Sequence, residues 1–157
     1  MFLGLRPAFA LVAATASNTM NVTGTVTANC TISAIGINFV YDPVSAASVT
    51  ASGTLTVACT KGSSPSITLD PGQHSANAGA PSTRAMSQTV AGTNYYLGYD
   101  IRQPGTTIPW GTGGAGFVPS QPTSKVARDF SLDGVVTGGQ DVPVGTYLDT
   151  VTATVNF

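Results

Sequence analysis

Hydrophobic and polar residues alternate along most of the chain, and this period of two is typical of β-strands. The longest alternating run covers residues 19–33. Its apolar face carries Met20, Val22, Gly24, Val26, Ala28, Cys30 and Ile32, with Thr, Asn and Ser between them. Because a strand usually has about 5–6 residues, the run predicts two strands in series. The first strand is expected to end and the second to begin between residues 24 and 28, near Gly24.

Shorter alternating runs predict the remaining strands, and turn residues separate them. Strands are expected over residues 35–41, 54–60, 66–69, 94–101, 108–110, 126–132 and 147–157. Either Asp133-Gly134 or Gly138-Gly139 is expected to end the strand that begins at residue 126. Residues 111–122 form a loop rich in Gly and Pro. Several short strands without any helical period predict an all-β sandwich.

The two ends of the strand pattern indicate how the sandwich is used. The last run places Val151, Ala153, Val155 and Phe157 on its inward face and stops on that apolar side chain. An apolar edge strand with no neighbour needs something to cover it. The first half of the 19–33 run is a candidate for that cover. The alternative is that it pairs inside its own domain as an ordinary first strand.

Composition and charge narrow the possible functions. The 157 residues fit one domain, and only 8% of them are charged, against a usual value of about 25%. Glu is absent, so few strong helix formers are present. The net charge is -1, and the only cations are two Lys and four Arg. No basic face is therefore expected that could neutralise a run of phosphates, and we expect no nucleic-acid partner.

The first sixteen residues have the features of a secretory signal peptide. Arg6 precedes an apolar stretch over residues 7–14, and Ala14-Thr15-Ala16 has the A-x-A form of a cleavage site. We therefore predict residues 1–16 as a signal peptide and expect export. The apolar stretch is shorter than the about 20 residues that span a bilayer, so no membrane insertion is expected after cleavage. The alternative is an ordinary buried N-terminal segment.

Cys30 and Cys59 both fall in strand-like sequence. In an exported protein such a pair favours a disulfide, because two thiolates without a nearby His cannot complete a tetrahedral zinc shell. Two buried free thiols are the alternative. We expect no metal and no cofactor.

Catalytic chemistry has little support in this sequence. The single imidazole, His74, lies in a loop of small residues over 73–82, where we expect a solvated side chain, and no G-x-S-x-G elbow occurs. Most of the seven Asp flank Pro or Gly, where they cap turns, and Asp149 is interpreted as a structural hydrogen-bonding residue. No catalytic residue is expected, and the protein is not expected to be an enzyme.

The aromatic residues allow two interpretations. Tyr95, Tyr96, Tyr99 and Trp110 could stack on a sugar, but in a sandwich with one core they are expected at its core and rim. Phe117 and Val118, in the Gly/Pro loop, are the candidates for an exposed adhesive tip, because no core position is evident for them.

Several short motifs resemble the spore coat protein U domain, a family that includes subunits of Csu-type, archaic chaperone-usher pili. The motifs are C-T-I-S-A at 30–34, I-N-F at 37–39, Y-D-P at 41–43, T-L-T-V at 54–57, R-x-M at 84–86, N-Y at 94–95, W-G at 110–111, D-V-P-V-G-T-Y-L-D-T-V at 141–151 and V-N-F at 155–157. The likeness covers residues 28–157, and the run at 141–151 is its most specific part. The chain departs from the family at residues 39–42, where F-V-Y-D lacks the usual Gly.

The resemblance implies an immunoglobulin-like sandwich that lacks its final strand and is completed by donor-strand exchange. Residues 17–27 would be the donor arm, with Met20, Val22, Gly24 and Val26 at its apolar positions, and residues 28–157 the sandwich. The acceptor groove would be lined by Val151, Ala153, Val155 and Phe157.

The same resemblance implies a function and partners. The expected function is a structural pilus subunit that supports surface attachment and biofilm formation. The expected partners are a periplasmic chaperone, an outer-membrane usher and neighbouring pilin subunits, with passage through the periplasm to the cell surface. The alternatives are a pilus-tip adhesin, or a secreted coat or matrix protein with sugar- or surface-binding loops.

Overall fold

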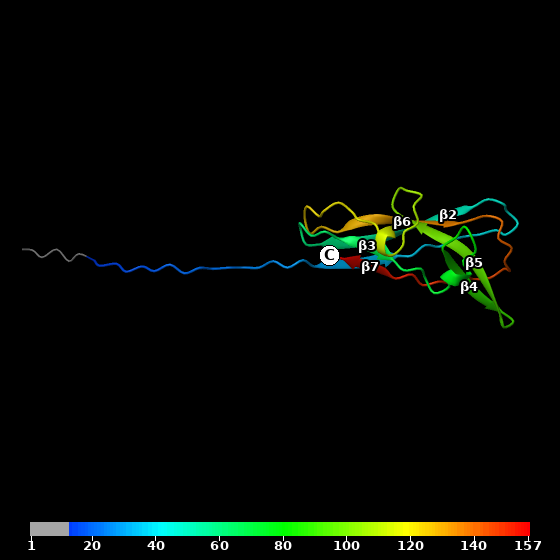
Figure 1. Cartoon of the computed structure of the whole chain (residues 1–157), viewed down its shortest axis with the longest axis horizontal. Coiled ribbons are helices and arrows are strands. Elements are labelled where there is room, and N and C mark those ends of the chain that lie inside the picture. Colours follow the sequence, from blue (N-terminus) through cyan, green and yellow to red (C-terminus); the bar gives the residue numbers. More distant parts are fainter. Residues whose placement is uncertain (1–12) are drawn as a thin grey trace, which may run out of the picture.

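The computed structural model describes residues 13–157, and most of the predicted signal peptide, 1–16, lies outside the described residues. Apart from two short 3₁₀ turns, the regular secondary structure of the described chain consists of β-strands joined by long connections (Figure 1). Its strands are β1 (Cys30–Ile35), β2 (Val49–Cys59), β3 (Ser66–Leu69), β4 (Arg84–Val90), β5 (Thr93–Arg102), β6 (Arg128–Val136) and β7 (Ala153–Asn156). Two single 3₁₀ turns, η1 (Ser75–Asn77) and η2 (Gly113–Ala115), lie in the connections.

The strands form two sheets, and every pairing between them is antiparallel. The larger sheet has the order β1-β2-β6-β5-β4, and the smaller one pairs β3 with β7. Leu55 and Val57 of β2 share one core with Ile67 and Leu69 of β3, so the sheets pack face to face. The all-β sandwich predicted from the sequence is confirmed. Strands β1 and β7 each have one neighbour and are therefore edge strands.

Trp110 and Phe117 join the core from the loops. Trp110 is fully buried, and its indole N–H donates to the carbonyl oxygen of Ile67 at 2.8 Å. The ring of Phe117 lies 5.4 Å from that of Trp110 and 5.5 Å from that of Phe130. Phe117 also exchanges two backbone hydrogen bonds of 2.8 Å with Ile67. The expectation that Phe117 is an exposed tip is therefore wrong, whereas Val118 is 71% exposed.

The strand predicted over residues 35–41 is wrong. Strand β1 ends at Ile35, and residues 36–42 have no ladder. The alternation of Ile37 and Phe39 arises from packing, since a Cβ atom on Gly134 would lie 3.0 Å from Ile37 and 2.6 Å from Phe39. Asp133-Gly134 was one of the two expected ends of this strand, but β6 continues through Gly134 to Val136. The packing of Ile37 and Phe39 against Gly134 explains why a glycine lies inside the strand.

Three further strand predictions differ from the structure. Strand β4 was not predicted, because its buried and half-buried positions include Arg84, Ser87 and Gln88. The strand expected over 108–110 is only a single bridge between Arg102 and Pro109. The strand expected over 147–157 is limited to β7, and residues 149–152 carry no ladder.

A buried cation holds three segments together. Arg84 is 2% exposed, and its guanidinium donates to the carbonyl oxygens of Asp70, at 2.8 and 3.1 Å, and of Trp110, at 2.6 Å. Burial lowers the pKa of Arg84, although nearby Tyr99 and Asp100 oppose this shift. Because these carbonyl oxygens belong to separate loops, Arg84 fixes both of them against β4.

The predicted disulfide is confirmed. Cys30 and Cys59 face each other in the β1–β2 ladder, and their sulfur atoms are 2.04 Å apart. The bond fixes the edge strand β1 at the point where the preceding residues leave the sandwich.

Replacing both cysteines, Cys30→Ser with Cys59→Ser, is expected to lower the free energy of unfolding by about 3–4 kcal/mol. The two cysteines are 29 residues apart in the sequence, and the disulfide restricts the unfolded chain over the loop that it closes. Urea unfolding of both proteins measures the difference, with the reduced wild-type chain as control. Equal midpoints for the oxidised wild type and the double variant would contradict the prediction.

Gly134→Ala is expected to destabilise the fold by about 1–3 kcal/mol, because the added methyl group would overlap with the Phe39 and Ile37 side chains. Gly114→Ala is the matched control, since no atom lies within 4 Å of its Cβ position. Thermal unfolding of the two variants measures the contrast. A Gly134→Ala variant as stable as Gly114→Ala would show that this packing is not tight.

Candidate functional site

A groove of about 710 Å³ opens between two segments of the sandwich and leads down to its core. One side, the N-terminal wall, is formed by residues 34–43, which begin in the last two residues of β1 and continue beyond it. The other side, the C-terminal wall, is formed by residues 142–151, which precede β7. The groove floor consists of core side chains from both sheets: Leu55, Leu69, Met86, Leu97, Tyr99, Ile101 and Leu132. We call this feature the core groove.

The core groove reaches side chains that are almost fully buried. Its floor residues Leu55 and Leu132 are only 0% and 6% exposed. Its volume nevertheless falls within the about 300–1,000 Å³ of clefts that hold small ligands or inserted side chains. The groove can therefore receive apolar side chains that enter one after another, and such side chains would extend the existing core.

The N-terminal wall is held by its aromatic residues. The ring of Phe39 lies 6.0 Å from that of Tyr99 on the groove floor. The Tyr41 hydroxyl accepts a hydrogen bond from the Gln140 backbone N–H at 2.7 Å and donates to the Gln140 carbonyl oxygen at 3.1 Å. These two contacts fix the wall at its middle and at its far end.

The C-terminal wall is fixed to β4 and β5 although it is not a regular strand. Leu148 exchanges two backbone hydrogen bonds of 2.9 Å with Ser87. The Asp149 carboxylate accepts hydrogen bonds from the Tyr99 hydroxyl at 2.7 Å and from the Gln73 backbone N–H at 2.9 Å. Burial, together with the hydrogen bond to Asp149, raises the pKa of Tyr99. The predicted structural role of Asp149 is confirmed.

The two walls are not joined to each other. In the described part of the chain, no backbone hydrogen bond links residues 34–43 to residues 142–151. Strands β1 and β7, by contrast, approach each other to within 8 Å between Cα atoms. A strand placed between two others needs about 9.6 Å, twice the usual spacing. The groove is therefore open along its walls and narrow between the two edge strands.

The residues predicted from the sequence to line an acceptor groove all lie on or next to β7. Val151 and Ala153 line the core groove. Val155 is half-buried against the core cluster, and Phe157 is 55% exposed, and neither belongs to the groove lining. Sequence analysis missed the greater part of the C-terminal wall. The only signal for it was the run at 141–151, which stood out as a family motif without a structural role.

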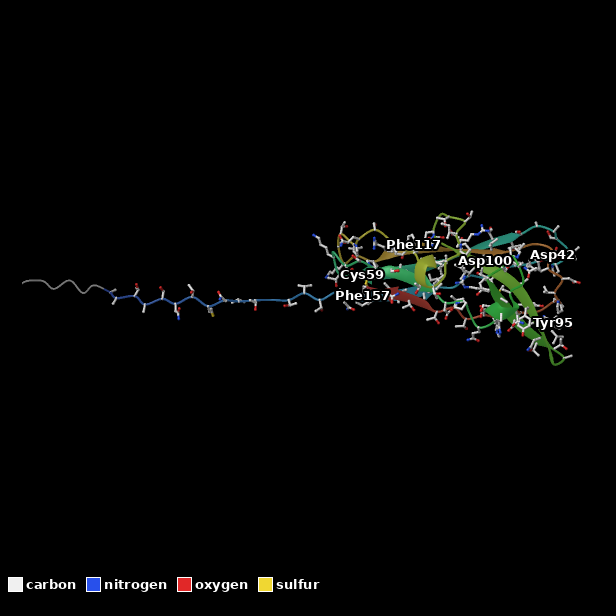
Figure 2. All side chains as sticks on the ribbon, viewed as in Figure 1. Asp42, Cys59, Tyr95, Asp100, Phe117 and Phe157 are labelled. Carbon is white, nitrogen blue, oxygen red and sulfur yellow. A yellow bond between two sulfur atoms is a disulfide. The ribbon has the colours of Figure 1, made fainter. Side chains whose placement is uncertain are left out.

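The predicted donor segment lies away from the groove. Residues 13–29 have no secondary structure and are exposed throughout. Met20, Val22 and Val26 are 88%, 87% and 85% exposed, and nothing lies within 4 Å of the Cβ position of Gly24. The segment leaves the sandwich at the end where Cys59 and Phe157 lie, whereas Asp42 and Tyr95 lie near the opposite end (Figure 2).

A second, polar cleft lies behind the C-terminal wall. His74 is half-buried there, and its Nε2 atom is 2.9 Å from the Ser87 hydroxyl oxygen. The centroid of its ring lies 5.9 Å from that of the Tyr96 ring. The expectation of a solvated histidine is therefore wrong. Among residues 13–157, no three His, Cys, Asp or Glu side chains are grouped so that they could hold a metal ion. No helix in that range has the length and hydropathy to cross a membrane.

Comparison with solved structures supports the fold. The chain superposes with a TM-score of 0.60 and 24% identity on the crystal structure of the CsuC–CsuE chaperone–tip adhesion subunit pre-assembly complex, from the archaic chaperone-usher Csu pili of Acinetobacter baumannii. The match covers 85% of this chain but only 41% of the matched one, so the chain spans about two fifths of that protein's length. The immunoglobulin-like fold class is confirmed.

Comparison of sequences gives the family. Protein U of Myxococcus xanthus is 38% identical over 165 aligned residues, which cover 92% of this chain and 87% of that protein. The family model of the Spore Coat Protein U domain matches residues 16–154, nearly the whole chain. The resemblance seen in the motifs is thereby confirmed: the chain belongs to the Spore Coat Protein U domain family.

Proposed function

We propose that this protein is a structural subunit of a chaperone-usher pilus that polymerises by donor-strand exchange. In this mechanism the arm at residues 17–27 of one copy enters the core groove of the next. One observation carries the proposal: the same chain has a groove that leads to its core and an apolar, alternating arm that is exposed. The groove offers apolar surface that no strand covers, and the arm offers apolar side chains that are not buried.

The energetics of such a joint are favourable. Each of Met20, Val22 and Val26 would contribute about 1.5–3 kcal/mol on full burial. Together they would supply on the order of 5–8 kcal/mol before the ordering of the arm is counted. Pairing of the arm with the unpaired edges beside the groove would add main-chain hydrogen bonds, as in other cases of β-augmentation.

The placement of arm and groove favours a fibre over a closed dimer. The arm leaves the sandwich at the Cys59 end (Figure 2), and its donor surface differs from the surface that would receive it. A contact between two different surfaces is heterologous, so each added copy offers a new arm or groove to the next one. Such contacts form open filaments when the rotation between copies does not close a ring.

An empty groove also implies partners that fill it before assembly. An apolar groove of this size would promote aggregation if it were left open. We propose that a periplasmic chaperone occupies it during transit, that an outer-membrane usher supports exchange of that strand for a subunit arm, and that the product is displayed on the cell surface. The Acinetobacter structure supports this proposal, because it is a pre-assembly complex of a chaperone with a pilus subunit. Surface attachment and biofilm formation would be the roles of the fibre.

Val22→Asp is expected to abolish fibre assembly, because a carboxylate would have to enter the apolar groove. Thr23→Asp is the matched control, since the next residue of an extended strand points to the opposite face. Both variants are expressed in the native host, where assembly partners are present. Electron microscopy of sheared cell-surface material and sedimentation measure the fibres.

The Val22 variant is expected to remain monomeric, whereas the Thr23 variant forms fibres of wild-type length. Normal fibres from Val22→Asp would contradict the donor role of the arm. Loss of fibres from both variants would show that a charge anywhere on the arm, rather than entry into the groove, disturbs assembly.

A further inference from the structure

The side chain of Gln88 reaches from β4 into the C-terminal wall. Its Nε2 atom lies 3.2 Å from the carbonyl oxygens of both Pro143 and Val144 and 3.0 Å from the hydroxyl of Tyr147. The Tyr147 hydroxyl in turn donates to the carbonyl oxygen of Pro143 at 2.9 Å. One side-chain amide therefore fixes a bend of five residues.

Gly145 provides the space for this contact. Its φ angle is +153°, a conformation that favours glycine. A Cβ atom at this position would overlap with the Oε1 atom of Gln88. The glycine therefore lets the Gln88 amide lie directly against the backbone of the wall.

The C-terminal wall has few other attachments on this side. Within residues 142–151, the only backbone–backbone hydrogen bonds in the described structure are the two that join Leu148 to Ser87. Residues 142–147 lack such bonds, and Gln88 supplies the polar contacts that a ladder would otherwise provide. Val142, Tyr147 and Val151 pack against the core, whereas Val144 and Leu148 are 97% and 69% exposed, so the bend around Val144 is held by the Gln88 contacts and not by burial of its own side chain.

The hydrophobic effect acts against an open groove. Closing the walls over the floor would remove apolar surface from water, so an empty groove tends to collapse unless its walls are held apart. The approach of β1 to β7 shows that the neighbouring part of the gap is already narrow.

We propose that Gln88 is a positioning residue that holds the C-terminal wall in place and so keeps the core groove open for an incoming strand. The identity of that strand, the arm of another copy, rests on the function proposed above. The role needs an amide at this position, because a carboxylate of the same size cannot donate to the carbonyl oxygens of Pro143 and Val144.

The test uses Gln88→Glu, which keeps the size of the side chain and removes its donors. Gln121→Glu is the matched control, because the Gln121 amide also donates to a backbone carbonyl, that of Gly62 at 2.7 Å, but lies outside the groove lining. Both changes are made in the full exported chain carrying Val22→Asp, so that its own arm does not fill the groove. Hydrogen exchange is then followed along residues 142–151, together with the midpoint of thermal unfolding.

Gln88→Glu is expected to speed exchange of the Leu148 amide, which donates to the Ser87 carbonyl oxygen at 2.9 Å, by about tenfold or more, with little change elsewhere, because the wall loses the Gln88 contacts that hold it against β4. Gln121→Glu should leave exchange in the wall unchanged. A synthetic peptide of residues 17–29 serves as the probe for strand entry. Its dissociation constant is expected to rise about tenfold for the Gln88 variant and to stay unchanged for the Gln121 variant.

The two readouts separate this inference from the proposed function. Unchanged wall exchange in Gln88→Glu would overturn the positioning role, whether or not the peptide binds. Faster wall exchange in a chain whose unmodified groove does not bind the peptide would support the positioning role and overturn donor-strand exchange. If Gln88→Glu does not fold, Gln88→Met removes the same donors without adding a charge, and unchanged wall exchange in that variant would equally overturn the inference.

Discussion

The floor of the core groove is made of the same side chains that hold the two sheets together. Leu55 and Leu132 come from the larger sheet, Leu69 comes from the smaller one, and all three face the gap between the N-terminal and C-terminal walls. Anything that enters the groove therefore adds directly to the core. This shared surface is the constraint from which the rest follows, because the stability of the fold and the affinity of the groove depend on the same apolar contacts.

The disulfide and the buried polar contacts that stabilise the sandwich lie around the core groove and do not block its opening. The disulfide fixes β1 at the end of the molecule where the arm departs, so the arm begins from a rigid point. On the other side, Arg84 joins two loops to β4, and the Tyr99–Asp149 hydrogen bond ties the C-terminal wall to β5. These polar contacts connect loops that lie outside the backbone ladders to the strands.

Sequence patterns predicted the elements in which side-chain alternation and backbone pairing coincide. In β2 the buried positions Leu55, Val57 and Cys59 follow the period of a paired strand, and the strand predicted over 54–60 is confirmed, although β2 begins earlier, at Val49. Where a different force sets the pattern, prediction was wrong: Ile37 and Phe39 alternate because they pack on Gly134. In the C-terminal wall only residues 147–151 alternate between half-buried and exposed, whereas residues 142–146 show no period and are held by side chains of distant strands. For that reason only part of the groove, Val151 and Ala153, could be anticipated.

A wall held mainly by side-chain contacts can still pair with an incoming strand, whereas a wall held by complete backbone ladders could not. A segment hydrogen-bonded along both edges cannot accept another strand, whereas residues 142–147 make no backbone–backbone hydrogen bond in the described structure. In the wall, the Gln88 amide bonds to the backbone only at the carbonyls of Pro143 and Val144, and its third partner is the Tyr147 hydroxyl. Apart from Leu148, which pairs with Ser87, the other backbone groups of the wall make no backbone–backbone hydrogen bond in the described structure and stay available for pairing. A strand that entered the core groove could therefore bury its side chains in the floor and add its backbone to the wall in one step, which makes insertion cooperative along the groove.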